Sequence, residues 1–222
     1  DERYKIAMDT LRKQMAEQPR TSEGGFWHKL RYPHQMWLDG IFMASPYLVQ
    51  YGATFNEPAL FDEATKQILL INSKTYDPAT GLLYHGWDES REQKWSNPET
   101  GCSPNFWSRS IGWYGAAIVD VLDFLPQETA GRDSIIQILQ GLAKAIVKYQ
   151  DPSSGTWYQV TDQGAREGNY LESSATALFI YTLAKAINKG YIGNEYIEPT
   201  QKAFDGMVKT FTRLEEDGSY TI

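Results

Sequence analysis

The sequence predicts an all-α protein built as a ring of helical hairpins. Three observations indicate this fold: apolar residues recur at helical spacing along most of the chain, one turn motif occurs twice, and two kinds of helix alternate. An ordinary helical array is the alternative that these patterns leave open. The chain has 222 residues, which suits one domain. We therefore expect residues 1–222 to form a single domain.

Helical periodicity covers seven segments of the chain, and no convincing pair of strands is predicted. Gly52, Pro126 and Gly190 follow three of these segments, where residues that end helices are expected. The predicted helices are residues 1–18, 36–51, 57–74, 108–125, 133–150, 170–189 and 195–211.

The turn motif Asp-Pro-x-x-Gly occurs at Asp77 to Gly81 and again at Asp151 to Gly155. Aspartate binds the local backbone, proline fixes its own φ, and glycine supplies the left-handed residue with which such a turn ends. Each turn is followed by aromatic residues and then by a mostly apolar helix. The motif therefore marks a repeating unit of the fold.

The apolar helices alternate with helices that carry polar stripes, which indicates an inner layer and an outer layer. The inner helices start at corresponding points, Trp37-Leu38-Asp39, Trp107-Ser108-Arg109 and Leu171-Glu172-Ser173. In a ring of hairpins, all inner helices begin at the same end. The side chains expected at that mouth are Trp37, Asp39, Trp107, Arg109 and Trp113.

Seven helices make about three and a half hairpins, whereas a closed ring of six hairpins needs twelve helices. The sequence therefore predicts part of a ring, without its N-terminal and C-terminal hairpins. Either the sequence is a piece of a longer chain or a homologous partner closes the ring, and we favour the first explanation.

Composition excludes some classes of function. The net charge is −7 and no run of Lys or Arg occurs, so a nucleic-acid partner is not expected. The 7 Trp and 14 Tyr favour a carbohydrate or aromatic ligand only modestly over a large core filled by aromatic side chains. An acidic sugar stays possible, because one or two local cations can bind a carboxylate against the overall charge.

Cysteine and histidine are scarce. Cys102 is the only cysteine and there are three histidines, so we expect no intrachain disulfide and no metal site. No apolar run is long enough for a transmembrane helix, and no signal peptide is visible. We expect no membrane partner, a monomer or weak dimer, and a bacterial cytoplasmic or periplasmic location that the sequence leaves undecided.

Two charged residues lie in strongly apolar sequence at predicted helix starts. Asp39 either caps its helix or faces a cavity, where it could act as a general acid. Arg109 lies among tryptophans, and burying an unpaired guanidinium is costly. It should therefore pair with an internal acid or bind an anionic ligand, since its fork matches a carboxylate.

The other candidates are aromatic or weaker. His85 follows the first turn and is either a structural hydrogen-bond partner or a site residue. Trp37, Trp107 and Trp113 form either plain core or a platform for a sugar ring. His28 and Lys29 precede Asp39 and could simply lie on the surface.

Several motifs in fixed order resemble glycoside hydrolase family 105, over nearly the whole chain. They are His28-Lys29, Trp37 to Met43, Gly81 to Trp87, Phe106 to Arg109, Gly112-Trp113 and Gly168 to Ser174. The resemblance implies an (α/α)6 barrel and an unsaturated rhamnogalacturonyl hydrolase, with Asp39 as proton donor. It further implies a pocket for the unsaturated uronate, with Trp37, His28 and Lys29 beside it. The residues implied to line that pocket are His85, Arg109, Trp107 and Trp113.

The resemblance also implies the chemistry. The substrate would be a pectin-type oligosaccharide made by a lyase, ending in a 4,5-unsaturated uronic acid. Asp39 would protonate C4, water would add at C5, and the hemiketal would open without a cofactor. Two departures from the family are noted: a pocket aspartate on an earlier helix lies outside this sequence, and Ser110-Ile111 replaces a Gly/Ala-Asn pair of some relatives.

Three other functions are compatible with a ring of helical hairpins that binds sugars. A sugar epimerase of the same architecture should present several histidines near the cavity, whereas only His28, His34 and His85 occur here. A uronate lyase would need a Tyr or Lys base near a neutralised carboxylate. A non-catalytic carbohydrate-binding protein would keep the tryptophans and Arg109 but would not need Asp39.

Overall fold

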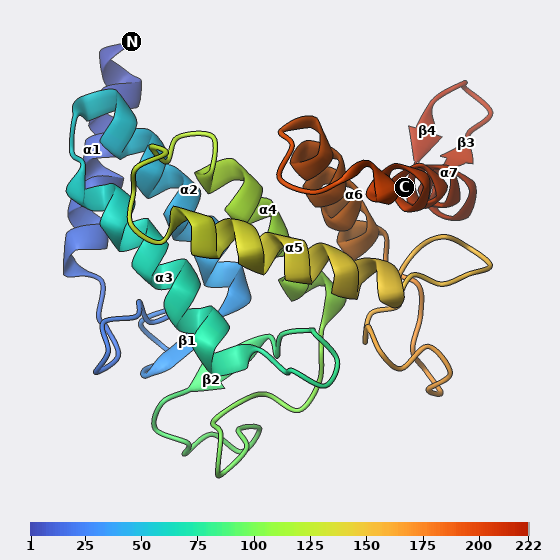
Figure 1. The fold of residues 1–222 in the computed structure, drawn as a ribbon, viewed down its shortest axis with the longest axis horizontal. Coiled ribbons are helices and arrows are strands. Elements are labelled where there is room, and N and C mark those ends of the chain that lie inside the picture. The colour runs from blue at the N-terminus through green and yellow to red at the C-terminus, as the bar shows by residue number, and fades with distance from the viewer. Residues whose placement is uncertain (222) are drawn as a thin grey trace.

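The computed structural model describes residues 1–221, and it confirms the all-α prediction (Figure 1). Within these residues, every helix is too short or too polar to span a lipid bilayer. The helices are α1 (Glu2–Glu17), α2 (Leu38–Phe55), α3 (Ala59–Thr75), α4 (Ser108–Val121), α5 (Arg132–Lys148), α6 (Ser173–Asn188) and α7 (Ile197–Phe211), with a short 3-10 helix at Asn194–Tyr196.

Helices α2, α4 and α6 pack side by side as an inner layer, and each is followed by an outer helix, α3, α5 or α7. Most of α4 is buried, whereas α1 contains no buried residue. Small residues let the inner helices approach closely, since a Cβ added at Gly112 of α4 would lie 2.7 Å from Leu178 Cβ of α6. The predicted arrangement of hairpins is therefore present.

Both Asp-Pro-x-x-Gly turns adopt the predicted conformation. The N–H of Gly81 donates to the Asp77 carbonyl, and that of Gly155 donates to the Asp151 carbonyl, both at 2.8 Å. A side-chain oxygen of each aspartate accepts a further backbone N–H of its own turn. The two glycines have φ of 79° and 76°, the left-handed region that favours glycine.

The prediction of no strand pair is wrong. Strand β1 (Gln35–Trp37) pairs antiparallel with β2 (Gly86–Asp88), and β3 (Arg213–Leu214) pairs with β4 (Tyr220–Thr221). Strands of two or three residues are too short to show an alternating pattern, so the sequence gives no signal for them. The first pair matters for the site, because it fixes the loop after the first turn against the start of α2.

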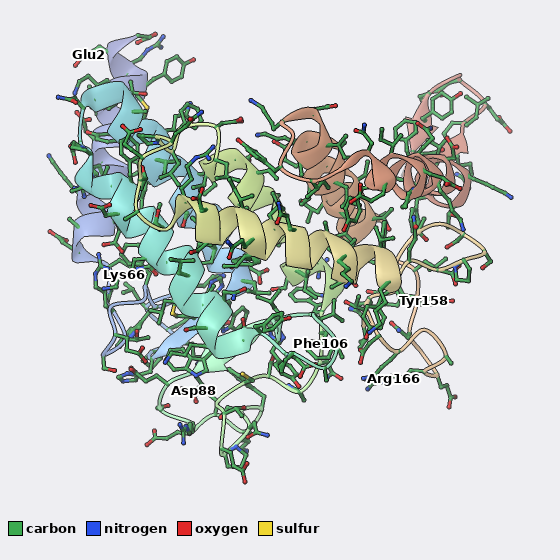
Figure 2. All side chains as sticks on the ribbon, in the orientation of Figure 1. Glu2, Lys66, Asp88, Phe106, Tyr158 and Arg166 are labelled. Carbon is green, nitrogen blue, oxygen red and sulfur yellow. The ribbon has the colours of Figure 1, made fainter. Side chains whose placement is uncertain are left out.

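The predicted alignment of the three helix starts is followed by their burial, since Leu38, Ser108 and Glu172 are all buried. Helix α6 begins at Ser173, one residue later than this alignment predicts, so its N-cap is Glu172, whereas the N-caps of α2 and α4 are Trp37 and Trp107. All three have extended backbones immediately before an inner helix. The loops that lead into α4 and α6 lie at one end of the molecule, where Asp88, Phe106, Tyr158 and Arg166 are labelled (Figure 2).

Candidate active site

Asp39 lies in the first turn of α2 and is half-buried. It does not cap the helix, because the N-cap residue is Trp37, which makes no side-chain cap bond. The hydroxyl of Ser110, a fully buried residue of α4, donates a hydrogen bond to Asp39 Oδ2. A hydrogen bond to a carboxylate is stronger than a neutral one and fixes its direction. Sequence reasoning missed this role of Ser110, since no local pattern links the two residues.

An aromatic wall runs beside Asp39, formed by rings from three segments. His28 stacks on Trp37 with ring centroids 4.5 Å apart, and the edge of His85 meets Trp37 at 5.6 Å. His85 then meets Trp107 edge-on at 5.7 Å. The N–H of Leu38 donates to the His85 carbonyl at 2.9 Å, which holds this loop against α2. Four of the predicted site residues are therefore brought together.

Two further rings extend this wall, and sequence reasoning did not select them. Tyr32 stacks on Trp37 at 5.2 Å, and Trp95 lies 6.5 Å from His85. Both come from loops without a regular pattern. The only sequence signal for these two aromatic residues is that each lies in a loop close to a strand or turn of the site.

Both histidines of the wall are held neutral near pH 7. Burial lowers the pKa of His28 to about 4, against the opposing attraction of Asp39. Burial also lowers the pKa of His85, again against Asp39. Neutral imidazoles can donate or accept hydrogen bonds but supply no positive charge for an anionic ligand. That charge has to come from another residue.

Arg109, in the first turn of α4, supplies it. Its Nη1 lies 3.1 Å from Glu172 Oε1, and its guanidinium lies 4.3 Å from the Trp107 ring centre. The Arg109 side chain is 39% exposed, whereas that of Glu172 is 7% exposed. The expectation that Arg109 pairs with an internal acid is confirmed. The single contact leaves other guanidinium N–H groups free for a ligand.

The wall also contains buried polar atoms that have no hydrogen-bond partner within the described residues. They are Nδ1 of His28, Nδ1 of His85 and Nε1 of Trp107. Buried polar atoms are normally paired, so an ordered water or a ligand group is expected to complete these three.

Two predicted site residues make other contacts than the ring contacts of this wall. Trp113 lies one helical turn beyond Arg109 and packs against Phe42, with ring centroids 4.6 Å apart. Lys29 is exposed and forms no ion pair within residues 1–221. Lys29 also forms an isolated antiparallel bridge with Tyr32, so it lies next to the wall.

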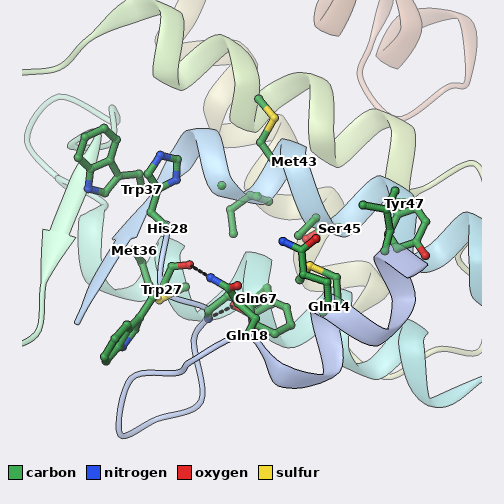
Figure 3. A pocket seen from close by; sticks show the side chains of 16 residues that line it. Gln14, Gln18, Trp27, His28, Met36, Trp37, Met43, Ser45, Tyr47 and Gln67 are labelled. Atoms are coloured by element: carbon green, nitrogen blue, oxygen red, sulfur yellow. Dashed lines mark hydrogen bonds between the residues drawn. The ribbon is translucent and has the colours of Figure 1, made fainter. Parts of the chain in front are cut away.

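A pocket of about 310 Å³ lies between α1 and α2 (Figure 3). His28, Trp37 and Gly40 line it, but Asp39, His85 and Arg109 do not. Its remaining wall is mostly apolar. We place the candidate site at Asp39, because the carboxylate, the guanidinium and the unpaired polar atoms converge there. Within residues 1–221, no three His, Cys, Asp or Glu side chains gather as metal ligands.

Residues 1–222 match the family model described as Glycosyl Hydrolase Family 88. The chain belongs to this family.

A solved structure of a glycoside hydrolase from family 105 of C. acetobutylicum is similar to this family 88 chain, with 42% identity and a TM-score of 0.96. The match covers 99% of this chain and 61% of that one, so the chain spans about three fifths of that structure. The resemblance to family 105 is therefore confirmed. The helical hairpins are those of the (α/α)6 barrel of these enzymes, as the sequence predicted.

Two curated relatives give further comparisons. Protein Atu3128 of Agrobacterium fabrum is 36% identical over 180 residues, 79% of this chain and 76% of that protein. The unsaturated rhamnogalacturonyl hydrolase YesR of Bacillus subtilis is 26% identical over 205 residues, 90% of this chain and 54% of that protein.

Proposed function

We propose that residues 1–222 belong to a single catalytic domain of a hydrolase that removes a terminal 4,5-unsaturated uronic acid from lyase-generated oligosaccharides. The observation that carries the proposal is that a positioned carboxylate and a partly free guanidinium lie beside the same aromatic wall. Asp39 is held by Ser110, and Arg109 lies beside the same aromatic wall. The name of the B. subtilis relative points to the same class of substrate, and an unsaturated rhamnogalacturonan disaccharide is the substrate we favour.

The proposed substrate has one feature for each part of the site. Its carboxylate would bind the free N–H groups of Arg109, because a guanidinium fork matches a carboxylate. Its ring would lie against Trp107 and Trp37, whose flat faces suit the C–H groups of a sugar. His28 and His85 would bind its hydroxyls as neutral imidazoles. Lys29 and Trp113 would contact its edges.

The proposed reaction is hydration of the vinyl ether. Protonated Asp39 donates its proton to C4, and the positive charge that develops at C5 is shared with the ring oxygen. Water attacks C5, and its proton returns to the Asp39 carboxylate. The hemiketal formed at C5 then opens and releases the next sugar. One water is consumed for each glycosidic bond cleaved, and Asp39 ends in the state in which it began.

The deciding experiment follows the ultraviolet absorbance of the unsaturated uronate on a lyase-derived pectin disaccharide. The unaltered protein should remove the chromophore. Asp39→Asn should slow its loss by roughly 10²- to 10⁴-fold, the usual contribution of a general acid. Asp62→Asn is the matched control, because Asp62 is an exposed carboxylate in the first turn of the outer helix α3. It should leave the rate unchanged.

Other outcomes separate the competing functions. A lyase would create the chromophore rather than remove it, and an epimerase would leave it unchanged. A sugar-binding protein would bind the disaccharide with no change in absorbance, whether or not Asp39 is present. Any of these results with the unaltered protein would contradict the hydrolase.

A further inference from the structure

Glu172 makes an unusual contact for a residue that immediately precedes an inner helix. The N-cap residues of the other two inner helices, Trp37 and Trp107, present rings, whereas the N-cap of α6 is Glu172, a residue only 6% exposed that presents a carboxylate. Its Oε1 accepts a hydrogen bond from Ser174 Oγ at 2.6 Å and contacts Arg109 Nη1 at 3.1 Å. Its Oε2 has no partner within the described residues.

Burial makes the partner of this carboxylate important. A buried ionised carboxylate costs several kcal/mol unless a cation and hydrogen bonds compensate it. Arg109 is the cation that the described residues place beside Glu172. Because Ser174 fixes one oxygen of Glu172, the ion pair draws the guanidinium to a defined place on the third hairpin.

The same pair leaves the outer side of the guanidinium available. Trp107 covers one face of it at 4.3 Å, and Glu172 contacts one terminal nitrogen. The side chain is still 39% exposed, so it remains accessible to solvent beside the Trp107 ring. The residue after Arg109 in α4 is Ser110, which holds Asp39.

We propose that Glu172 is a positioning residue that aims the Arg109 guanidinium at the carboxylate of the substrate. The inference rests on the proposed function and adds to it the residue that sets recognition of an acidic sugar. Glu172 itself touches no substrate. The effect of Glu172 on substrate binding should therefore depend entirely on Arg109, and it should be seen only with substrates that have a free carboxylate.

A double-mutant cycle tests this. We would measure kcat and KM for the unsaturated disaccharide and for its methyl ester, with Glu172→Ala, Arg109→Ala and the double variant. Misplacing a binding group costs up to about 100-fold. Glu172→Ala should lower kcat/KM for the acid by roughly 10- to 100-fold, mainly through KM, and for the neutral ester by less than about threefold. In the Arg109→Ala background the same change should have an effect below about twofold.

Two further variants separate positioning from general stability. Glu172→Gln keeps the acceptor oxygen and should restore kcat/KM for the acid to within about fivefold of the unaltered protein. Asp120→Asn breaks another ion pair between α4 and α6, at their opposite ends, where Asp120 Oδ1 lies 2.6 Å from Lys185 Nζ. It should lower the unfolding temperature without changing the preference for acid over ester.

The inference is overturned if Glu172→Ala lowers kcat/KM equally for acid and ester, or equally with and without Arg109. If Glu172→Ala does not fold, Glu172→Gln is compared in the unaltered protein and in the Arg109→Ala variant. The same dependence on Arg109 is then tested with smaller changes in kcat/KM. If the unaltered protein consumes neither substrate, the proposed hydrolase fails separately. The cycle is then measured as binding of glucuronate and its methyl ester by tryptophan fluorescence, where absence of acid-selective binding also overturns the role of Glu172.

Discussion

At the scale of single residues, the site is defined by hydrogen bonds and ion pairs that position its charged side chains. Ser110 holds Asp39 across two inner helices, and Glu172 holds Arg109 across the next pair. The aromatic wall removes water from His28 and His85 and so keeps them uncharged. Each of these states depends on a neighbour from another part of the chain.

His28 gives a prediction for pH. Its pKa is about 4 in the folded protein against an ordinary value of 6.5, so the unfolded chain takes up its proton first as the pH falls. The contribution of neutral His28 to stability is therefore complete above pH 6.5 and declines as the pH drops toward 4. Because solvent screens a half-buried group, we expect a loss on the order of 1 to 2 kcal/mol.

Two measurements check this prediction. Titration of the His28 ring protons by NMR should give a midpoint near 4. His28→Gln should show a smaller drop in the free energy of unfolding, measured with urea, between pH 7 and pH 4.5. A midpoint at or above the ordinary histidine value would show that the wall does not exclude water from His28.

At the scale of elements, the two Asp-Pro-x-x-Gly turns hold each hairpin to an outer helix. A Cβ at Gly155 would lie 2.6 Å from the Lys202 carbonyl oxygen of α7, whereas one at Gly81 would lie 3.3 Å from Ala145 Cβ of α5. Both residues have positive φ, so alanine is strained at either position. Only the Gly155 turn adds a collision with backbone.

We therefore predict an order of destabilisation for glycine-to-alanine variants. Gly168→Ala is the control for backbone strain alone, since Gly168 has φ of 76° and no atom within 4 Å of an added Cβ, and it should cost about 1 kcal/mol. Gly81→Ala should cost about 1 to 2 kcal/mol and Gly155→Ala about 3 kcal/mol or more. Urea unfolding measures all three, and equal losses would contradict the proposed contact with α7.

At the scale of the whole molecule, inner and outer helices should respond differently to the same substitution. Gly112 lies at the contact of α4 with α6, while Gly141 on α5 has no atom within 4 Å of an added Cβ. Gly112→Ala should cost about 1 to 3 kcal/mol through overpacking. It should also lower activity, because it separates the helix of Arg109 from the end of the loop that carries Glu172.

Gly141→Ala is the matched control and should raise stability by about 0.5 to 1 kcal/mol, because alanine favours a helix interior over glycine. Its activity should stay at the unaltered level. Thermal unfolding and initial rates measure both variants. A loss of activity in Gly141→Ala, or none in Gly112→Ala, would contradict the assignment of the site to the inner layer.

Sequence alone determined the layers of this protein. Helical periods, the Asp-Pro-x-x-Gly turns and the apolar character of the inner helices are properties of short windows, so seven helices and their order were predictable. The same windows place Asp39 and Arg109 at helix starts, where a ring of hairpins brings side chains together. The motifs that indicate the family are also local.

Tertiary structure decided the partnerships. Ser110 and Asp39 are 71 residues apart in the chain, and no local pattern specifies that contact. The strand pair β1–β2, the contact of Glu172 with Arg109 and the packing of Trp113 on Phe42 likewise depend on how hairpins dock. The physical reason is that periodicity fixes which face of a helix is buried, whereas packing between helices fixes which side chains on those faces meet.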